Sequence, residues 1–512
     1  MTISRHFVSL RTYALAFAVV LSPAFMQTSD LTCTPRTGDT TLSMLEFEVD
    51  GVNQIAAFTS SQRSYDVSTT SDTAIVRAQS TDPAATVDYQ WWAGSTFLGS
   101  GPIGVGGGEV TLDVPVGQSA LRIYVRPPGG AYAHYSVNVA GRDEFPCTEQ
   151  GILDAIARGG GPHTFDCAGP TTVATTDTIV IGNDVILDGA GDLTVESQNG
   201  NAVWVSAGVT AELQGFILTH RELTPPLPRG SYGGGAAGIF NQGDLTLTNS
   251  TVSGNYGGHS SLGCGDRGCS YTGGGIINEP SGVLTLVGST VEANVADFIG
   301  GIENLGTLTI ADSTVSGNAE LPPSPDAPSM AGGIWSWSWS GLSVNITNST
   351  ISDNDGVGIV VGELILANST VSGNTGVGVS AEVLTATNNT VSGNGGTDLQ
   401  SFVGPVTLAN NIVDGTCFFL SAISLGYNIE SPGNTCGFDQ PTDQVDVTAA
   451  ELNLGPLTDN GGPTMTHALL PGSVAIDWIP AGMCQTSEDQ RGVMRPQGVA
   501  CDVGAFELEV AP

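Results

Sequence analysis

The sequence predicts an all-β chain whose central part is a solenoid of stacked coils with three short strands per coil. One unit, LTLTNSTVSGN from Leu245, returns with small changes from Leu284, Leu308, Val344, Leu364 and Leu384. Apolar residues alternate within each copy, which is the period of a strand and not of a helix. The residues after the corner, Ser349, Ser369 and Asn389, recur every 20 positions, which fits one coil and is too short for an independent domain.

Asparagine or aspartate marks the corner between the two strands of each copy. These residue types tolerate the left-handed backbone that a sharp corner needs, and we expect their stacked side chains to bond along the column. The corner residues are Asn249, Asp312, Asn348, Asn368 and Asn388. The asparagines also match the N-x-[ST] glycosylation pattern, which we interpret as a by-product of the repeat.

This repeat resembles the right-handed parallel β-helix, or pectin-lyase-like, superfamily in its Gly-, Asn- and Thr-rich form. The resemblance covers residues 170–430 less their insertions. It implies a right-handed parallel β-helix of about ten coils, which at one strand spacing per coil is roughly 50 Å long.

Composition places limits on the partners. With 40% hydrophobic and 12% charged residues, the chain of 512 residues is typical of a folded protein. Its formal charge is −36, and all 14 basic residues are arginine. Such acidity disfavours nucleic acid, anionic lipid and polyanionic glycans unless an arginine patch or a bridging cation reverses the local field. We therefore expect no nucleic-acid partner.

Residues 1–27 combine Arg5 and Arg11 with a short apolar run and small residues, which predicts a secretory signal peptide. No later stretch is apolar enough to insert in a membrane, so we expect a secreted, extracellular or cell-surface protein. Export makes disulfides the expected state of the cysteines, and no pair has the spacing of a zinc site. Proximity pairs Cys147 with Cys167, Cys264 with Cys269, Cys417 with Cys436, and Cys484 with Cys501, and leaves Cys33 over.

Residues 34–143 lack the coil repeat but hold alternating runs between turns rich in Gly, Pro and Ser, which predicts a small β-sandwich. The order LSMLEFEVDG, SYDVSTT and AYAHYSVNVAGR resembles the cadherin-like domains of bacterial surface proteins. Trp91 and Trp92 are able to stack on a sugar, but neighbours on a strand face opposite sides, so we expect one of them in the core.

A helix is predicted at 149–158, EQGILDAIAR, with Ile152, Leu153 and Ile156 on one face. Its place just before the coils predicts an N-terminal cap that shields the open end of a β-helix spanning 146–435. The segment around it resembles the entry region of a family of secreted bacterial β-helix proteins.

Residues 445–509 resemble the choice-of-anchor Q domain that often ends proteins of that family. The matching segments are LNLGPLTDNGGPTMTHALLPGSVAID from Leu452 and DQRGVMRPQGVACDVGAFELE from Asp489. The ending contains four polar residues of catalytic type, which we interpret as internal contacts that close this end. They are His467, Asp477, Asp489 and Arg491.

Three insertions, at 220–234, 256–273 and 319–330, leave from the same corner of the coil. Equivalent corners stack, so these loops are expected along one side of the rod. They hold the reactive groups that are candidates for catalysis, namely His220, Arg221, Glu222, Asp266 and Arg267.

The strand after each insertion carries a row of outward side chains beside the loops. Aligning GIFN at Gly238, GIIN at Gly275, GIEN at Gly301 and GIWS at Gly333 places each isoleucine inward and the next residue outward. An exposed row with aromatic rings near Arg and carboxylate groups suits the apolar faces and hydroxyls of a sugar chain. The alternative is that the loops fold over these rings and bury them. The predicted ligand-binding residues are Phe240, Glu303, Trp335, Trp337, Trp339 and Arg229, with Ile277 in the same row.

Three functions remain open. One is non-catalytic binding of a polysaccharide, a cell-surface glycan or another surface partner through the loop side, and another is a passive structural or adhesin rod. The third is a polysaccharide lyase or glycosidase. The NTD, DD, GHG and RxK signatures of polygalacturonases are absent, and the lack of lysine excludes a lysine base. A hydrolase would need two nearby carboxylates among Glu222, Asp266, Asp297, Glu303 and Asp326. We expect no cofactor, with calcium on loop carboxylates as the alternative, and favour binding.

Overall fold

The computed structural model describes residues 39–509, except 70, 72, 94–95, 115–116, 129–131, 141–142, 221–237, 258–272, 321–330 and 337–342. Its contacts divide the chain into two compact units, one holding most of residues 39–138 and the other holding residues 139–509. The expected signal peptide, Cys33, the Cys264–Cys269 pair and several site candidates lie outside the described residues.

The first unit consists of two small sheets, which fits the predicted β-sandwich. One sheet has the strand order β2-β1-β4-β7 and the other has the order β3-β9-β8-β5-β6. The strands are β1 (Leu42–Val49), β2 (Val52–Asn53), β3 (Ser64–Ser68), β4 (Thr73–Ser80), β5 (Thr86–Ala93), β6 (Thr96–Val105), β7 (Gly107–Asp113), β8 (Gln118–Arg126) and β9 (Ala133–Ala140). Trp91 lies in the core at 3% exposure, which confirms that one tryptophan of the pair is internal.

The helix α1 (Glu149–Arg158) forms where the sequence predicts it and follows β10 (Asp143–Pro146). The Thr148 hydroxyl accepts from the Gly151 N–H at 3.1 Å and so satisfies one free donor of the first turn. Ile152 and Ile156 pack into the core of the coils, whereas Leu153 is 36% exposed, so the buried face is narrower than predicted. A disulfide between Cys147 and Cys167 fixes this end.

The coils form three parallel sheets, here called sheets I, II and III in the order in which each coil visits them. Sheet I contains β13 (Ile179–Ile181), β15 (Val203–Val205), β17 (Ile239–Asn241), β21 (Ile276–Asn278), β25 (Ile302–Asn304), β29 (Ile334–Ser336), the first parts of β32 (Ile359–Ala367) and β34 (Val379–Thr387), β36 (Leu399–Ser401) and β39 (Cys417–Phe419). These ten rungs agree with the expected number of coils.

Sheets II and III complete each coil. Sheet II contains β11 (Gly160–Asp166), the first parts of β14 (Val185–Ser197) and β16 (Thr210–His220), β18 (Asp244–Thr248), β22 (Val283–Val287), β26 (Thr307–Ala311), β30 (Ser343–Thr347), the second parts of β32 and β34, β37 (Val406–Ala409) and β40 (Ala422–Ser424). Sheet III contains β12 (Thr171–Thr175), the second parts of β14 and β16, β19 (Thr251–Ser253), β23 (Thr290–Glu292), β27 (Thr314–Ser316), β31 (Thr350–Ser352), β33 (Thr370–Ser372), β35 (Thr390–Ser392), β38 (Ile412–Asp414) and β41 (Ile429–Glu430).

The repeated units stack in register, which confirms the prediction that each copy belongs to one coil of a stack. Leu245, Leu284, Leu308 and Val344 are successive partners in sheet II, and each is at most 1% exposed. The marked corners also behave as predicted, since Asn249, Asp312, Asn348, Asn368 and Asn388 all have φ between 48° and 57°. Asn368 donates to Asn348 Oδ1 at 2.9 Å, as expected for a stacked corner.

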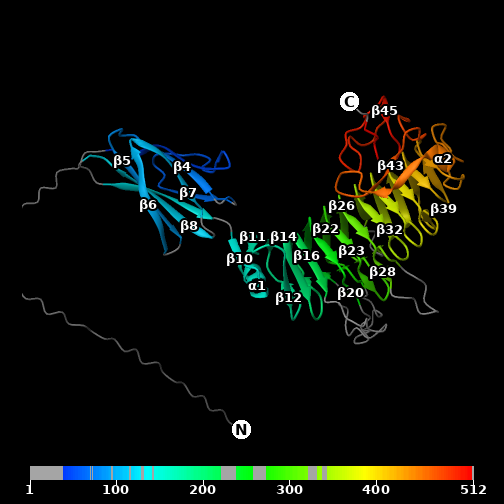
Figure 1. Ribbon diagram of the computed structural model, residues 1–512, viewed down its shortest axis with the longest axis horizontal. Helices are drawn as coiled ribbons and strands as arrows, with labels where there is room; N and C mark the ends of the chain where they lie inside the picture. The colour runs from blue at the N-terminus through cyan, green and yellow to red at the C-terminus, as the bar shows by residue number, and fades with distance from the viewer. Residues whose placement is uncertain are drawn as a thin grey trace, which may run out of the picture. The chain divides into compact units, whose positions relative to one another are not determined.

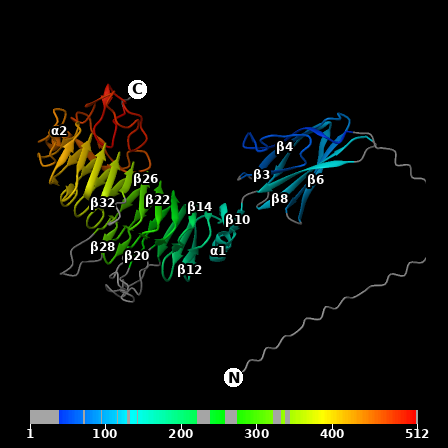
Figure 2. The same cartoon turned by 180° about the vertical axis from the view of Figure 1, so that it is seen from behind.

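A fourth, short sheet was not predicted. It consists of β20 (Tyr256–Gly257), β24 (Val295–Ala296) and β28 (Ala319–Glu320), which lie at the corner between sheets III and I. The described ends of the three insertions meet at this corner, as the repeat alignment requires. Figure 1 and its reverse view in Figure 2 place β20 and β28 on the side of the stack away from the C-terminal region.

The C-terminal region, here residues 445–509, folds back along the coils (Figure 1). It contains α2 (Ala449–Leu452), β42 (Leu454–Thr458), β43 (Thr466–Leu469), β44 (Ile479–Pro480) and β45 (Ala500–Cys501). Gln490 donates to the hydroxyl of Thr350 at 2.8 Å, and the hydroxyl of Thr370 donates to Gln490 Oε1 at 2.6 Å, so the region covers the outer face of late sheet III strands. The far end of the β-helix is closed by Phe438 and by the Cys417–Cys436 disulfide.

Candidate functional site

Sheet I turns one residue of every rung away from the core. We call this row the outer column, and it runs through Val180, Trp204, Phe240, Ile277, Glu303, Trp335, Val360, Ser380, Gln400 and Phe418. Their neighbours on the strands, such as Ile239 and Ile302, belong to the central core, which confirms the predicted facing. The column therefore unites Phe240, Glu303 and Trp335, as the sequence predicts.

The middle of the outer column is buried, so the expectation of an exposed row is wrong there and the alternative of a covered row holds. Ile277 is fully buried and Glu303 is 4% exposed. The chain that returns from the second insertion lies over them, because a Cβ added to Gly273 would stand 2.8 Å from Ile277 Cγ1 and 3.2 Å from Glu303 Cβ. Glu303 therefore cannot meet a ligand at the surface in this conformation.

At the N-terminal end the outer column is open. Trp204 is 38% exposed and Val180 on the rung before it is 45% exposed. The rings of Trp204 and Phe240 meet edge to face, with centroids 5.6 Å apart and planes at 87°. The indole N–H of Trp204 donates to Gln242 Oε1 at 3.3 Å, which orients the ring. Trp204 was missed as a candidate, although VWV at 203–205 aligns with IFN at 239–241.

Acidic side chains at this corner are also buried. Asp297 and Glu320 are 2% and 6% exposed, and both, like Glu303 and His220, have interaction partners. Burial removes Asp297 and Glu303 from the set of carboxylates open to a polymer. Among the residues that the structure describes, no group of three or more His, Cys, Asp or Glu side chains is arranged to hold a metal ion.

The remaining site predictions lie outside the described residues. These are the catalytic candidates Arg221, Glu222, Asp266 and Arg267 and the ligand candidates Arg229, Trp337 and Trp339. Of the predicted set, the structure thus brings together Phe240, Glu303 and Trp335 in one column, with His220 at the end of β16.

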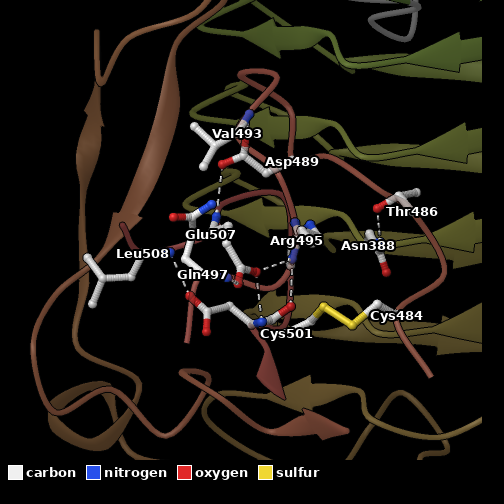
Figure 3. Close-up of polar contacts among 12 residues, drawn as sticks. Asn388, Cys484, Thr486, Asp489, Val493, Arg495, Gln497, Cys501, Glu507 and Leu508 are labelled. Carbon is white, nitrogen blue, oxygen red and sulfur yellow. Dashed lines mark hydrogen bonds and ion pairs between the residues drawn. A yellow bond between two sulfur atoms is a disulfide. The ribbon is translucent and has the colours of Figure 1, made fainter. Parts of the chain in front are cut away.

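The polar residues of the C-terminal region form an internal network (Figure 3). Asp489 is 1% exposed and accepts from the Nε and Nη2 of Arg491 at 2.9 and 2.7 Å, and from the N–H of Glu507 at 2.9 Å. Arg495 and Glu507 form an ion pair at 3.1 Å whose side chains are 0% and 1% exposed. With its acceptors already occupied, Asp489 is not open to a substrate. The contacts are internal, as predicted, but they hold together the C-terminal region that lies on sheet III and do not close the end of the coils.

His467 has a structural part in the same region. Its Nδ1 lies 2.7 Å from the Gly455 carbonyl and must donate to it, so Nε2, 2.8 Å from Ser372 Oγ, accepts from that hydroxyl. Burial lowers the pKa of His467, which fits this neutral form. The hydrogen bond between Ser372 and His467 therefore joins the C-terminal region to sheet III. Both residues are buried.

The same region predicts a pH effect on stability. Burial raises the pKa of Asp502 from 3.8 to about 6. A raised folded-state pKa gives stability that is present below pH 4 and lost as the pH rises through 6, worth about 3 kcal/mol for this group. We expect Asp502→Asn to remove this part of the pH dependence. The free energy of unfolding, followed by urea denaturation at pH 4 to 8, checks it.

The two stability curves must be compared as a difference, because His467 has the opposite effect on stability. Its lowered pKa makes the folded protein less stable as the pH falls. Subtracting the Asp502→Asn curve from that of the unaltered chain cancels the His467 contribution. Asp439→Asn, at an exposed carboxylate, is the matched control and should leave the curve unchanged. An Asp502→Asn curve parallel to that of the unaltered chain would contradict the assignment.

Comparison with known proteins finds only distant similarity to solved structures. No protein-family model matches the chain, and no curated protein sequence matches it. A solved pectate lyase is 15% identical, with a TM-score of 0.36, over 69% of this chain and 90% of that one. A family 28 exopolygalacturonase from Yersinia enterocolitica is 11% identical, with a TM-score of 0.24, over 73% and 86%. A pectate lyase from Pectobacterium carotovorum is 9% identical, with a TM-score of 0.15, over 74% and 86%. At such scores the likeness carries no argument about activity, and the fold rests on the strand register of the chain itself.

Proposed function

We propose that the protein binds a polysaccharide or a cell-surface glycan, without cleaving it, at the open N-terminal end of the outer column. The supporting observation is the pair of rings formed by Trp204 and Phe240, with Val180 on the preceding rung. Consecutive rungs are about 4.8 Å apart, so these side chains make a narrow apolar strip along the rod. Such a strip suits the apolar face of a sugar chain, and Gln242 supplies a polar amide beside it.

The rest of the proposal concerns location and the terminal domains. Three disulfides, Cys147–Cys167, Cys417–Cys436 and Cys484–Cys501, fit an oxidising compartment. Among the described residues no helix is long and apolar enough to span a membrane. We infer a secreted or cell-surface protein that carries a cadherin-like sandwich before the β-helix and a choice-of-anchor Q region after it.

Binding is tested by affinity electrophoresis of the chain through gels that contain neutral or acidic polysaccharides. We expect Trp204→Ala to weaken retention about tenfold, because an aromatic contact of this kind is worth about 1 kcal/mol or slightly more. Val283→Ala is the matched control, since Val283 is a similarly exposed apolar residue of sheet II. Equal retention of the two variants would overturn the site.

The absence of cleavage is tested separately with calcium present. Reducing ends and the ultraviolet absorbance of unsaturated products are followed for neutral and acidic polymers, and we expect neither to form. Product that disappears when Arg221, Glu222 and Asp266 are all replaced by alanine would overturn the non-catalytic proposal and indicate a lyase or a hydrolase.

A further inference from the structure

The outer face of the five-stranded sheet of the sandwich carries a second group of exposed aromatic and polar side chains. Alternation along β8 sends Leu121, Ile123 and Val125 into the core, each fully buried, and leaves Tyr124 and Arg126 on the outside. β9 does the same, with Tyr135 buried and His134 exposed. The face is thus held by strands whose inner residues form a packed core.

Three rings and one guanidinium group lie together on this face. The Tyr124 ring has its centroid 5.6 Å from that of Tyr132 and 5.7 Å from that of His134. The Arg126 guanidinium carbon lies 4.7 Å from the Tyr132 centroid and 5.3 Å from that of Tyr124. Tyr132 is 58% exposed, so much of its ring faces water. An exposed aromatic platform of this kind is typical of ligand contact.

Hydrogen-bond donors and acceptors border the rings, and contacts between the strands hold them in place. Arg126 Nε donates to Asp88 Oδ2 at 3.2 Å, and the Tyr124 hydroxyl donates to Gln90 Oε1 at 3.1 Å. These contacts join neighbouring strands β5 and β8 and fix the direction of the side chains. The face therefore offers donors, acceptors and ring surface in one fixed arrangement.

We propose that this face, defined by Asp88, Gln90, Tyr124, Arg126, Tyr132 and His134, is a binding site for a neutral, hydroxyl-rich oligosaccharide. Sugar rings present apolar C–H faces to aromatic rings and hydroxyls that both donate and accept, which is the combination found here. A purely apolar partner would cover the N–H groups of Arg126 that Asp88 does not bind, without pairing them. An anionic polymer is disfavoured because Asp88 already neutralises Arg126 and the chain as a whole has a charge of −36.

This site is independent of the one proposed on the β-helix, and the experiment separates them. The full chain is run through affinity gels that contain β-glucan, xylan or galactomannan as neutral polymers and polygalacturonate as the acidic one. The background variant is Trp204→Ala with Phe240→Ala, which removes the β-helix site. In this background we expect retention on at least one neutral gel, and Tyr132→Ala should weaken that retention about tenfold.

Two further variants make the outcome decisive. Arg126→Gln keeps a donor but removes the cation between the rings, and we expect a similar loss of retention. Val52→Ala, at an exposed position of the other sheet, should change nothing. We expect Tyr132→Ala to fold, because the Tyr132 ring is largely exposed, and an unchanged circular dichroism spectrum checks this. Loss of all neutral-gel retention in the Trp204→Ala, Phe240→Ala background, or retention on polygalacturonate alone, would overturn the proposal.

Discussion

Replacing Arg495 with methionine should lower the free energy of unfolding of the β-helix unit by about 3–5 kcal/mol. The guanidinium group is fully buried, where it pairs with Glu507 at 3.1 Å and donates to the carbonyls of Asp502 and Gly504 at 2.7 and 2.6 Å. Methionine fills much of the same volume but leaves Glu507 as a buried charge without its cation. The two carbonyls also lose their donor, and each unpaired polar group adds to the cost.

The change is measured by urea denaturation at neutral pH, followed by circular dichroism and tryptophan fluorescence. Glu488→Gln is the matched control, because Glu488 lies in the same region and is exposed, and we expect a change below about 1 kcal/mol. Limited proteolysis should cut residues 445–509 faster in Arg495→Met than in the control. A loss below about 1 kcal/mol would mean that water reaches the pair and that the region is not packed as the structure has it.

Much of the β-helix is predictable because its signals are local and repeated. Leu245 and its equivalents alternate with polar residues in every copy, and Asn348 or Asn368 marks the same left-handed corner each time. The helix at 149–158 is predictable for the same reason, since its apolar spacing and its cap lie within a few residues of each other. The disulfides Cys147–Cys167 and Cys417–Cys436 follow from proximity in the chain.

Features that depend on contacts between distant segments were not predicted. Glu303 has the alternation of an exposed residue, but it is buried and the chain that returns at Gly273 lies against it. The packing of Gln490 on Thr350 joins positions 140 residues apart, and the local sequence pattern around either residue does not predict it. Trp204 was missed for another reason, because its rung precedes the part of the chain in which the repeat is easiest to align.

The asparagine that ends each VSGN-type segment is a further feature whose importance only the structure reveals. In successive coils the Nδ2 of one such asparagine donates to the Oδ1 of the next, at distances of 2.9 to 3.0 Å, and the backbone N–H donates to the same oxygen. The ladder runs through Asn255, Asn294, Asn318, Asn354, Asn374 and Asn394 and ends on Asp398 Oδ1 at 2.9 Å. All its amide donors point the same way, so the bonds polarise one another.

Asn318→Asp should therefore destabilise the β-helix by about 3 kcal/mol or more at pH 7. The change keeps the size of the side chain but replaces a donor that bonds Asn354 Oδ1 and the Val291 carbonyl, both at 3.0 Å, with an acceptor. Asn318 is fully buried, so an ionised aspartate there would also lose its hydration. Protonation restores one donor, and its folded-state pKa should be raised, so the loss of stability should shrink as the pH falls toward 4.

Asn249→Asp is the matched control, because it makes the same chemical change at an exposed corner with φ of 48°, where aspartate is tolerated. We expect it to change the free energy of unfolding by less than about 0.5 kcal/mol at either pH. Urea denaturation of both variants at pH 4 and pH 7 gives the comparison. Equal changes in the free energy of unfolding for the two substitutions would contradict the prediction. They would mean that the asparagine ladder stabilises the coils no more than an exposed corner residue does.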